Sequence, residues 1–219
     1  MKYHLSFQLF STLSLASLLG AGCAPSMPVK PEPAPETVTT PMPDSPATTA
    51  PNPVPPPSAT IPTDEEVEKM TVEERDEAMK NFLEANGPMP MDESEKKEAM
   101  MKGEEMKEMA AEKNGSFHNV VHAAGGSAKL VQKDGKWMVV LSDDFKTDSG
   151  PDLHVYVSGH ADPRTSPDVH VDPSADLGRL ASTGGAQAYD LGAIDPNGVK
   201  SIVIYCKPFK VVFSVATLQ

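Results

Sequence analysis

Short alternating runs of apolar and polar residues fill the C-terminal half of the chain from Gly115 onward, and this period of two is typical of β-strands. Gly, Pro and Asp separate the runs. Lys133-Asp134-Gly135 stands between two of them, and Asp-Gly in this position favours a tight hairpin. About seven or eight strands in roughly 105 residues predict an all-β domain over 114–219, built as an antiparallel sandwich or barrel.

Two of the expected strands carry most of the candidate chemistry, and the alternation of side chains assigns their faces. In the first strand, one face holds Leu153, Val155 and Val157, and the other holds His154 and Tyr156. In the second strand, one face holds Ile202, Ile204 and Cys206, and the other holds Val203 and Tyr205.

Residues 64–113 predict acidic α-helices instead of strands. Thr63 and Thr71 are each followed by Glu three residues later. This spacing fits a capping box, in which the Thr hydroxyl accepts a backbone hydrogen bond while the Glu side chain reaches back. A helix is therefore expected from about Val72 to Ala85, with its stop signal in Asn86-Gly87-Pro88.

A further helix is expected from about Glu93 to Glu112, ending at Asn114-Gly115. Its methionines form a weak apolar stripe and are Met100, Met101, Met106 and Met109. Thioether sulfurs can bind copper(I). Methionine is also a good helix former and an adaptable packing residue, so the alternative is a helical stalk that is solvated or docks on another surface.

Residues 23–63 predict a disordered tether. The segment 24–63 contains 14 prolines and no aromatic residue, so it cannot bury enough apolar surface to form a core. At about 3.1 Å per residue in a polyproline II conformation, it would reach at most about 120 Å. Such a tether would hold a C-terminal domain clear of the surface that anchors its N-terminus.

Residues 1–22 are expected to be a lipoprotein signal peptide. The apolar run Leu5–Leu19 is shorter than the roughly 20 residues of a transmembrane helix, and small residues follow it. Leu19-Gly20-Ala21-Gly22-Cys23 resembles a bacterial lipobox, which implies an acylated Cys23 held in membrane lipid outside the cytoplasm. Ala24 would favour the outer membrane if the host has one. The alternative is an ordinary secretory signal with an incidental cysteine.

Composition excludes several functional classes. The 219 residues carry 31 acidic and 19 basic side chains, a net charge of −12, and most of this excess falls in 64–113. Nucleic acid is therefore excluded as a partner, because phosphate binding depends on clustered Lys and Arg. Common signatures of serine hydrolases, zinc peptidases and phosphate-binding loops are absent. Two cysteines are too few for a disulfide scaffold or a thiolate zinc site.

Within 114–219, several short motifs occur in a fixed order. They are Gly115-Ser116-Phe117, Asp144-Phe145, Gly150–Ser158, Asp176–Leu180, Gly185–Tyr189, Tyr205–Phe209 and Val212–Ala216. Together they resemble the DM13 electron-transfer domain. The resemblance implies a β-rich extracytoplasmic module with one characteristic cysteine, which serves redox chemistry as a bare thiol or by holding a prosthetic group such as haem.

Cys206 stands at the position of that cysteine, and Tyr205 meets the family's preference for an aromatic residue just before it. With Cys23 acylated, Cys206 would be the sole thiol of the mature chain and would have no disulfide partner within it. His154 is the candidate axial partner for a haem. The alternative is that Cys206 packs as a small apolar residue on its strand face.

Other potential metal ligands carry weaker signals. His118 and His122 could bind one ion only on a helix, because four residues along a strand separate them by roughly 13 Å. The Asp residues of the β-domain do not match a calcium loop that ends in Glu, and turn formation explains them. A cation site made partly of backbone carbonyls stays open as an alternative.

Two hypotheses follow, and whether the protein is an enzyme is left open. In the first, a membrane-anchored lipoprotein transfers electrons or performs redox chemistry through Cys206 with an envelope redox or protein partner. In the second, the chain is a non-catalytic binding or scaffold module of the cell envelope. The first requires a Cys206 sulfur that solvent or a cofactor can reach, whereas full burial favours the second.

Overall fold

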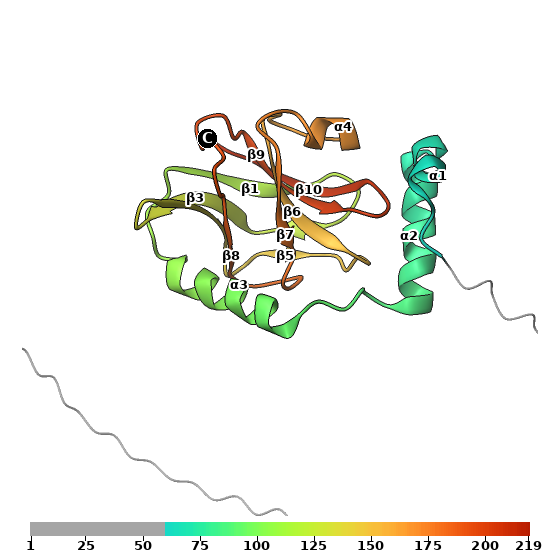
Figure 1. Ribbon diagram of the computed structural model, residues 1–219, viewed down its shortest axis with the longest axis horizontal. Coiled ribbons are helices and arrows are strands. Elements are labelled where there is room, and N and C mark those ends of the chain that lie inside the picture. The colour runs from blue at the N-terminus through green and yellow to red at the C-terminus, as the bar shows by residue number, and fades with distance from the viewer. Residues whose placement is uncertain (1–59) are drawn as a thin grey trace, which may run out of the picture. The chain divides into compact units, whose positions relative to one another are not determined.

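The computed structural model describes residues 60–219 (Figure 1). The predicted signal peptide, Cys23 and almost all of the proline-rich tether lie outside these residues. The described part forms four helices, which are α1 (Asp64–Lys69), α2 (Val72–Asn86), α3 (Glu93–Met106) and α4 (Ser166–Val169). Within residues 60–219, none of them combines the length and apolar composition that a membrane crossing requires.

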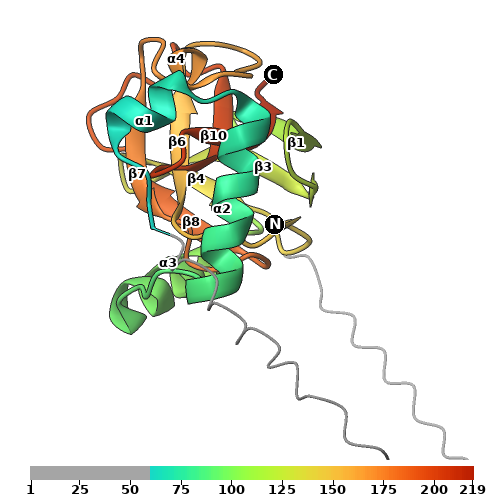
Figure 2. The same cartoon turned by 90° about the vertical axis from the view of Figure 1, so that its right-hand side faces the viewer.

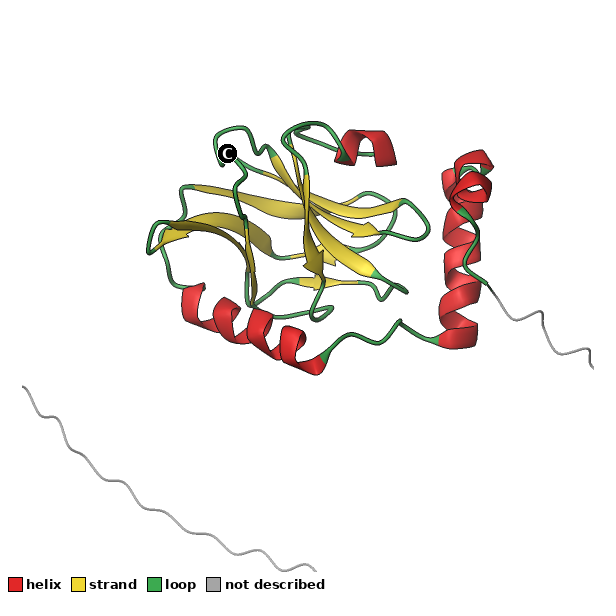
Figure 3. Cartoon of the chain, in the orientation of Figure 1, coloured by secondary structure: helices red, strands yellow, loops and turns green. Residues whose placement is uncertain are grey.

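Ten strands make up the rest of the described fold (Figure 3). They are β1 (Lys113–Asn119), β2 (Ala124–Gly125), β3 (Ser127–Lys133), β4 (Lys136–Leu141), β5 (Lys146–Thr147), β6 (Leu153–Ser158), β7 (Ala175–Arg179), β8 (Gln187–Asp190), β9 (Ser201–Cys206) and β10 (Val211–Thr217). Eight form one antiparallel sheet in the order β7-β6-β9-β10-β1-β3-β4-β8, and β2 pairs with β5. Because the end strands β7 and β8 contact each other, the sheet is a nearly closed barrel. The all-β prediction is confirmed.

The predicted hairpin joins β3 and β4. Asp134 and Gly135 form its turn, with φ angles of 51° and 78°. Two consecutive left-handed residues are what a tight type I′ turn requires, and Asp-Gly tolerates them well. The pairing of Lys133 with Lys136 then fixes the register of the two strands.

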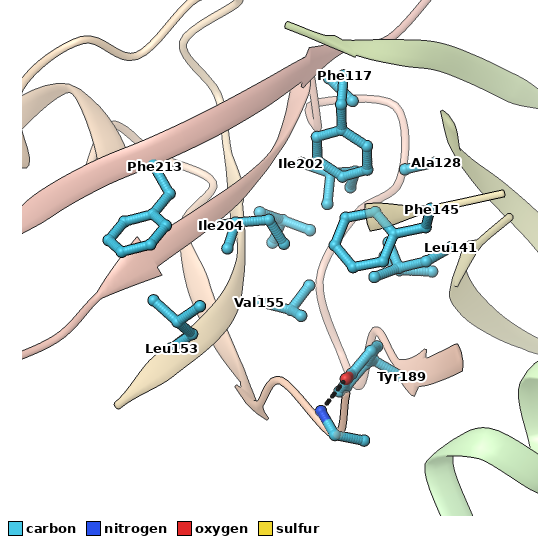
Figure 4. Close-up of a cluster of buried hydrophobic side chains, with 14 of the residues drawn as sticks. Phe117, Ala128, Leu141, Phe145, Leu153, Val155, Tyr189, Ile202, Ile204 and Phe213 are labelled. Atoms are coloured by element: carbon cyan, nitrogen blue, oxygen red, sulfur yellow. Dashed lines mark hydrogen bonds between the residues drawn. The ribbon is translucent and has the colours of Figure 1, made fainter. Parts of the chain in front are cut away.

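The hydrophobic core fills the inside of the barrel (Figure 4). Aromatic rings from distant parts of the chain meet there, and the rings of Phe117 and Phe145 lie 5.1 Å apart. Leu153 and Val155 of β6 and Ile202 and Ile204 of β9 point into the same core, as the alternation of their strands predicts.

Both predicted capping boxes are present. Thr63 precedes α1 and Thr71 precedes α2, and each exchanges hydrogen bonds with the Glu three residues on. Helix α2 ends at Asn86, and Gly87 follows with φ 71°, as expected for a left-handed C-cap.

The predicted end of the next helix was wrong. Helix α3 stops at Met106, and Asn114 and Gly115 belong to β1, where they pair with β3. Gly115 is required by close packing rather than by a helix stop, because a Cβ there would lie 2.0 Å from the Thr217 carbonyl oxygen. Pairing with β3 thus overrides the local sequence of Asn114-Gly115, which favours a helix end.

Helix α3 packs tightly against β8, the last strand of the sheet order (Figure 1). At Gly103 a Cβ would lie 2.3 Å from the backbone nitrogen of Gln187, so the helix and strand backbones touch. Met106 is buried beside Met138 and Ala188. The acidic segment therefore docks on the β-domain, a point that the sequence left open.

Helix α2 crosses one side of the same domain (Figure 2). Met79 is buried in the main core, and the Phe82 ring lies 6.0 Å from that of Phe209. The 87–92 linker between α2 and α3 is held by a hydrogen bond from the Met89 N–H to the Pro151 carbonyl, 2.7 Å long. Helix α2 and this linker thus cover the end of the barrel where β6 begins and β9 ends.

Candidate redox site

Cys206 is the last residue of β9, and its side chain points into the barrel. It pairs with Leu153 of β6 and with Val211 of β10. Its side chain is fully buried in the cluster that contains Ile204 and Phe209. The predicted face of β9 is therefore confirmed, and the sulfur has no exposed surface.

The surroundings of the Cys206 sulfur keep the thiol protonated. Burial raises the pKa of this thiol to about 12, because a thiolate would lose its hydration there. Hydrogen bonds from the backbone N–H groups of Asp152 and Phe209 lower the pKa, and burial outweighs them. At neutral pH the residue is therefore not a nucleophilic thiolate.

His154 lies on the outer face of β6, opposite Tyr205. Its ring is also buried, and both of its nitrogens face carboxylates. The Nδ1 atom lies 2.8 Å from Oδ1 of Asp176, and the Nε2 atom lies 3.3 Å from Oδ1 of Asp152. Both ring nitrogens are thus engaged within the described part of the chain.

Asp176 belongs to β7 and is positioned by a β-bulge. His154 pairs with Arg179 and Tyr156 pairs with Asp176, so β7 has one residue more than β6 between these pairs. Gly178, with φ 118°, absorbs the bulge and donates its N–H to Asp176 Oδ1 at 3.0 Å. The bulge thereby turns the Asp176 carboxylate toward His154.

Asp176 collects several donors. Besides His154, its Oδ2 atom accepts from Lys207 Nζ at 2.9 Å and from the Tyr156 hydroxyl at 3.2 Å. Burial raises the pKa of this carboxyl, but the hydrogen bonds from His154, Lys207 and Gly178 outweigh burial and hold the pKa well below its ordinary value. Asp176 is consequently ionised at neutral pH.

Arg179 completes the network on the other side of His154. Its Nε atom lies 2.6 Å from Oδ1 of Asp152, and its Nη1 atom donates to the Pro90 carbonyl at 2.6 Å. The same side chain therefore holds both the carboxylate and the 87–92 linker.

The model of the electron-transfer DM13 family matches residues 116–218, which hold this whole network apart from the linker. Residues 116–218 belong to the DM13 family. No curated protein and no solved structure matches the chain. Helices α1 to α3 precede the matched residues and are an addition to the DM13 domain of this chain.

The DM13 domain does not bring Cys206 and His154 together. Cys206 is directed to the inside of the barrel, whereas His154 is on the outer face of the neighbouring strand. Cys206 is also enclosed by packed side chains. The residues present therefore do not fit a haem held between these two side chains.

An aromatic cluster covers the outer face beside His154. The ring centroids of Tyr156 and Tyr205 lie 5.4 Å apart in an edge-to-face arrangement, and His170 lies 5.7 Å from Tyr156. The two tyrosines are almost fully buried, but His170 is exposed. Burial raises the pKa of both tyrosines, so they are neutral phenols at physiological pH.

The remaining histidines do not form one metal site. His118 Nε2 lies 2.9 Å from Asp162, whereas His122 Nε2 lies 3.0 Å from Asp76 of α2. Residues 60–219 contain no group of three His, Cys, Asp or Glu side chains placed to hold one ion.

The methionines of α3 are also divided. Met106 is buried in a packed cluster, whereas Met101 is largely exposed. Met106 is therefore a packing residue, whereas Met101 lies at the surface.

Sequence reasoning missed Tyr156, Asp152, Asp176 and Arg179 as members of one network. The acidic pair was interpreted as turn formers. The sequence held one signal for this network, which is the alternation of polar with apolar residues along Leu153–Val157 of β6. The structure shows that this strand is buried on both faces. Buried polar side chains need partners, and these had to come from elsewhere in the chain.

Proposed function

We propose that this chain is a lipid-anchored, extracytoplasmic electron-transfer protein, and that Cys206 of its DM13 domain exchanges electrons through the side chains that enclose it, because its sulfur is closed to solvent. The observation that carries the proposal is the DM13 match across residues 116–218, where Cys206 is the only cysteine of the described residues 60–219.

The protonated thiol limits the chemistry that Cys206 can perform. An electron that leaves the sulfur must be accompanied by the S–H proton, because the buried thiol is neutral. The electron would pass to an oxidised one-electron carrier, such as a ferric haem or copper(II) protein of the envelope, and the proton to water that reaches the sulfur when the barrel end opens. Disulfide exchange would require the barrel end to open first.

Membrane attachment is supported by the lipobox-like residues Leu19–Cys23 and the proline-rich segment after them. Replacing Cys23 with Ser in an expressing bacterium should move the protein from the membrane fraction to the soluble extracytoplasmic fraction. If mass spectrometry of the wild-type protein from the membrane fraction finds no acyl chain on Cys23, the lipid anchor is excluded.

Voltammetry of the detergent-solubilised chain tests the electron-transfer function. We expect a reversible wave that Cys206→Ala removes and that Val211→Ala leaves in place. Val211 is the matched control, because it pairs with Cys206 and is equally buried but carries no sulfur. Loss of the wave in both variants, or in neither, contradicts a redox role for Cys206.

One observation favours a second function. The complete burial of Cys206 among core side chains is also what a structural residue shows, and it favours a non-catalytic binding or scaffold module. Under that function, the wild-type chain gives no wave and Cys206→Ala alters only the free energy of unfolding.

A further inference from the structure

The three tyrosines in the described part of the chain differ in their hydroxyl partners. The Tyr189 hydroxyl donates to the Gln187 amide oxygen at 2.8 Å. The Tyr205 hydroxyl lies 2.7 Å from that of Ser166. Only Tyr156, among these three, donates to a carboxylate, the Asp176 Oδ2 atom at 3.2 Å.

A carboxylate partner changes what a buried phenol can do. When a phenol loses an electron, its O–H proton becomes strongly acidic, and a cation left in an apolar site is costly. A base in hydrogen-bond contact takes the proton in the same event. Tyr189 and Tyr205 have neutral partners and lack such a base in the described structure.

The groups around Asp176 keep it ready for this task. Lys207 and His154 hold the carboxylate ionised, so the atom that faces Tyr156 is an acceptor at neutral pH. His154 connects Asp176 to Asp152, whose carboxylate lies 3.3 Å from His154 Nε2. A proton received by Asp176 therefore lies within hydrogen-bond contact of His154 and Lys207.

The same phenol lies near the surface. The Tyr156 ring contacts Tyr205 and His170 at edge-to-face angles, and His170 is exposed. Tyr205 precedes Cys206 in β9, so the aromatic cluster lies between the protein surface and the strand that carries the thiol. An electron carrier that docks over His170 would approach Tyr156 through one layer of side chains.

We propose that Tyr156 is a one-electron redox residue of the DM13 domain and that Asp176 is its proton acceptor. The inference rests on the electron-transfer function proposed above and adds a residue to it. An oxidised one-electron carrier takes one electron from the Tyr156 phenol, while the proton moves from the Tyr156 oxygen to Asp176 Oδ2. Reduction returns the electron and proton and restores the neutral phenol.

The test uses the full chain with photogenerated tris-bipyridine ruthenium(III) as the oxidant. The phenoxyl radical is followed by transient absorption and electron paramagnetic resonance. We expect Tyr156→Phe to lower the radical yield by about tenfold or more, because it removes the phenol that would carry the radical. Tyr205→Phe and Tyr189→Phe are matched controls, because each removes one buried hydroxyl, and both should retain the radical.

Two further measurements address the proton. Asp176→Asn should slow radical formation, and transfer from a hydrogen-bonded phenol should be slower in D₂O than in H₂O. A rate that is equal in both solvents and unchanged in Asp176→Asn contradicts Asp176 as the acceptor. Thermal unfolding of each variant shows whether it folds. If Asp176→Asn does not fold, Tyr156→Phe, which loses a single hydroxyl, still tests the radical, and the comparison of H₂O with D₂O still tests the proton transfer.

The outcomes separate this inference from the proposed function. If wild type gives a voltammetric wave and Tyr156→Phe keeps both wave and radical, Tyr156 is excluded and the electron-transfer function stands. If Cys206→Ala loses the wave and still forms the Tyr156 radical, both proposals are supported. If wild type gives no wave, the electron-transfer function fails whatever the ruthenium oxidant does.

Discussion

The two faces of β6 and β9 are both buried, yet they are built on different principles. The inner face, with Leu153, Ile204 and Cys206, packs apolar groups whose contacts need no particular direction. The outer face, with His154 and Tyr156, depends on hydrogen bonds to partners at defined positions. The comparison teaches that the network of titratable side chains lies on the outer face of the barrel, whereas Cys206, the residue that the sequence predicts to carry the chemistry, lies inside.

The inner face should show the largest loss of stability. Ile204→Ala removes three buried carbons from a fully enclosed site and should lower the free energy of unfolding by about 2–5 kcal/mol. Urea denaturation measures this loss. On the outer face, Tyr205→Phe removes one hydrogen bond to Ser166 and should cost about 0.5–1.5 kcal/mol. Equal losses would erase the distinction between the faces.

The outer network should show an intermediate effect. Arg179→Ala leaves the partly buried Asp152 carboxylate without its arginine ion-pair partner and releases the Pro90 carbonyl, so the free energy of unfolding should fall by about 1–3 kcal/mol. The matched control is Arg164→Ala, because Arg164 pairs with Asp162 at the exposed surface and should cost less than about 1 kcal/mol. A larger loss in Arg164→Ala would contradict this account.

The smallest effect should be a change in how stability responds to acid. The pKa of Asp176 is lower in the folded state than in the unfolded chain, so its stabilisation is complete above the ordinary carboxyl pKa, about 3.9, and is lost as the pH falls through the folded value. Asp176→Asn should be less stable at neutral pH but should lose less on acidification below about pH 4. Urea midpoints across this range measure the difference.

Lys207→Met sharpens the acid experiment. It removes one donor from Asp176 and so raises the folded pKa of that carboxyl, and the acid-induced loss of stability should be smaller and should end at a higher pH than in the wild-type chain. An acid profile of Lys207→Met that overlays the wild-type curve would show that Lys207 does not hold Asp176 ionised.

Local pattern predicted much of the fold. Alternation along Leu153–Val157 placed every side chain on its observed face, and Asp134-Gly135 predicted the hairpin turn. The capping boxes at Thr63 and Thr71 predicted both helix starts. These features depend on residues a few positions apart, so sequence alone contains the information.

Features that depend on tertiary contacts could not be predicted from the sequence. The end of α3 depends on the pairing of Asn114 and Gly115 with β3. The meeting of Asp176 with His154 depends on a one-residue bulge in β7, after the loop that contains α4. For Cys206, alternation predicted the face, but only the packed barrel determined that the sulfur is closed to solvent.

Gly103 allows α3 to cover β8, the last strand of the sheet order. An open β-edge can recruit an identical edge from another molecule and start a growing aggregate. Helix α3 packs against β8, and Gly103 permits this close approach because a Cβ there would lie 2.3 Å from the Gln187 backbone nitrogen. A larger residue at 103 would push the helix away from β8, and we expect such a variant to self-associate at high concentration while Cys206 and Tyr156 keep their surroundings.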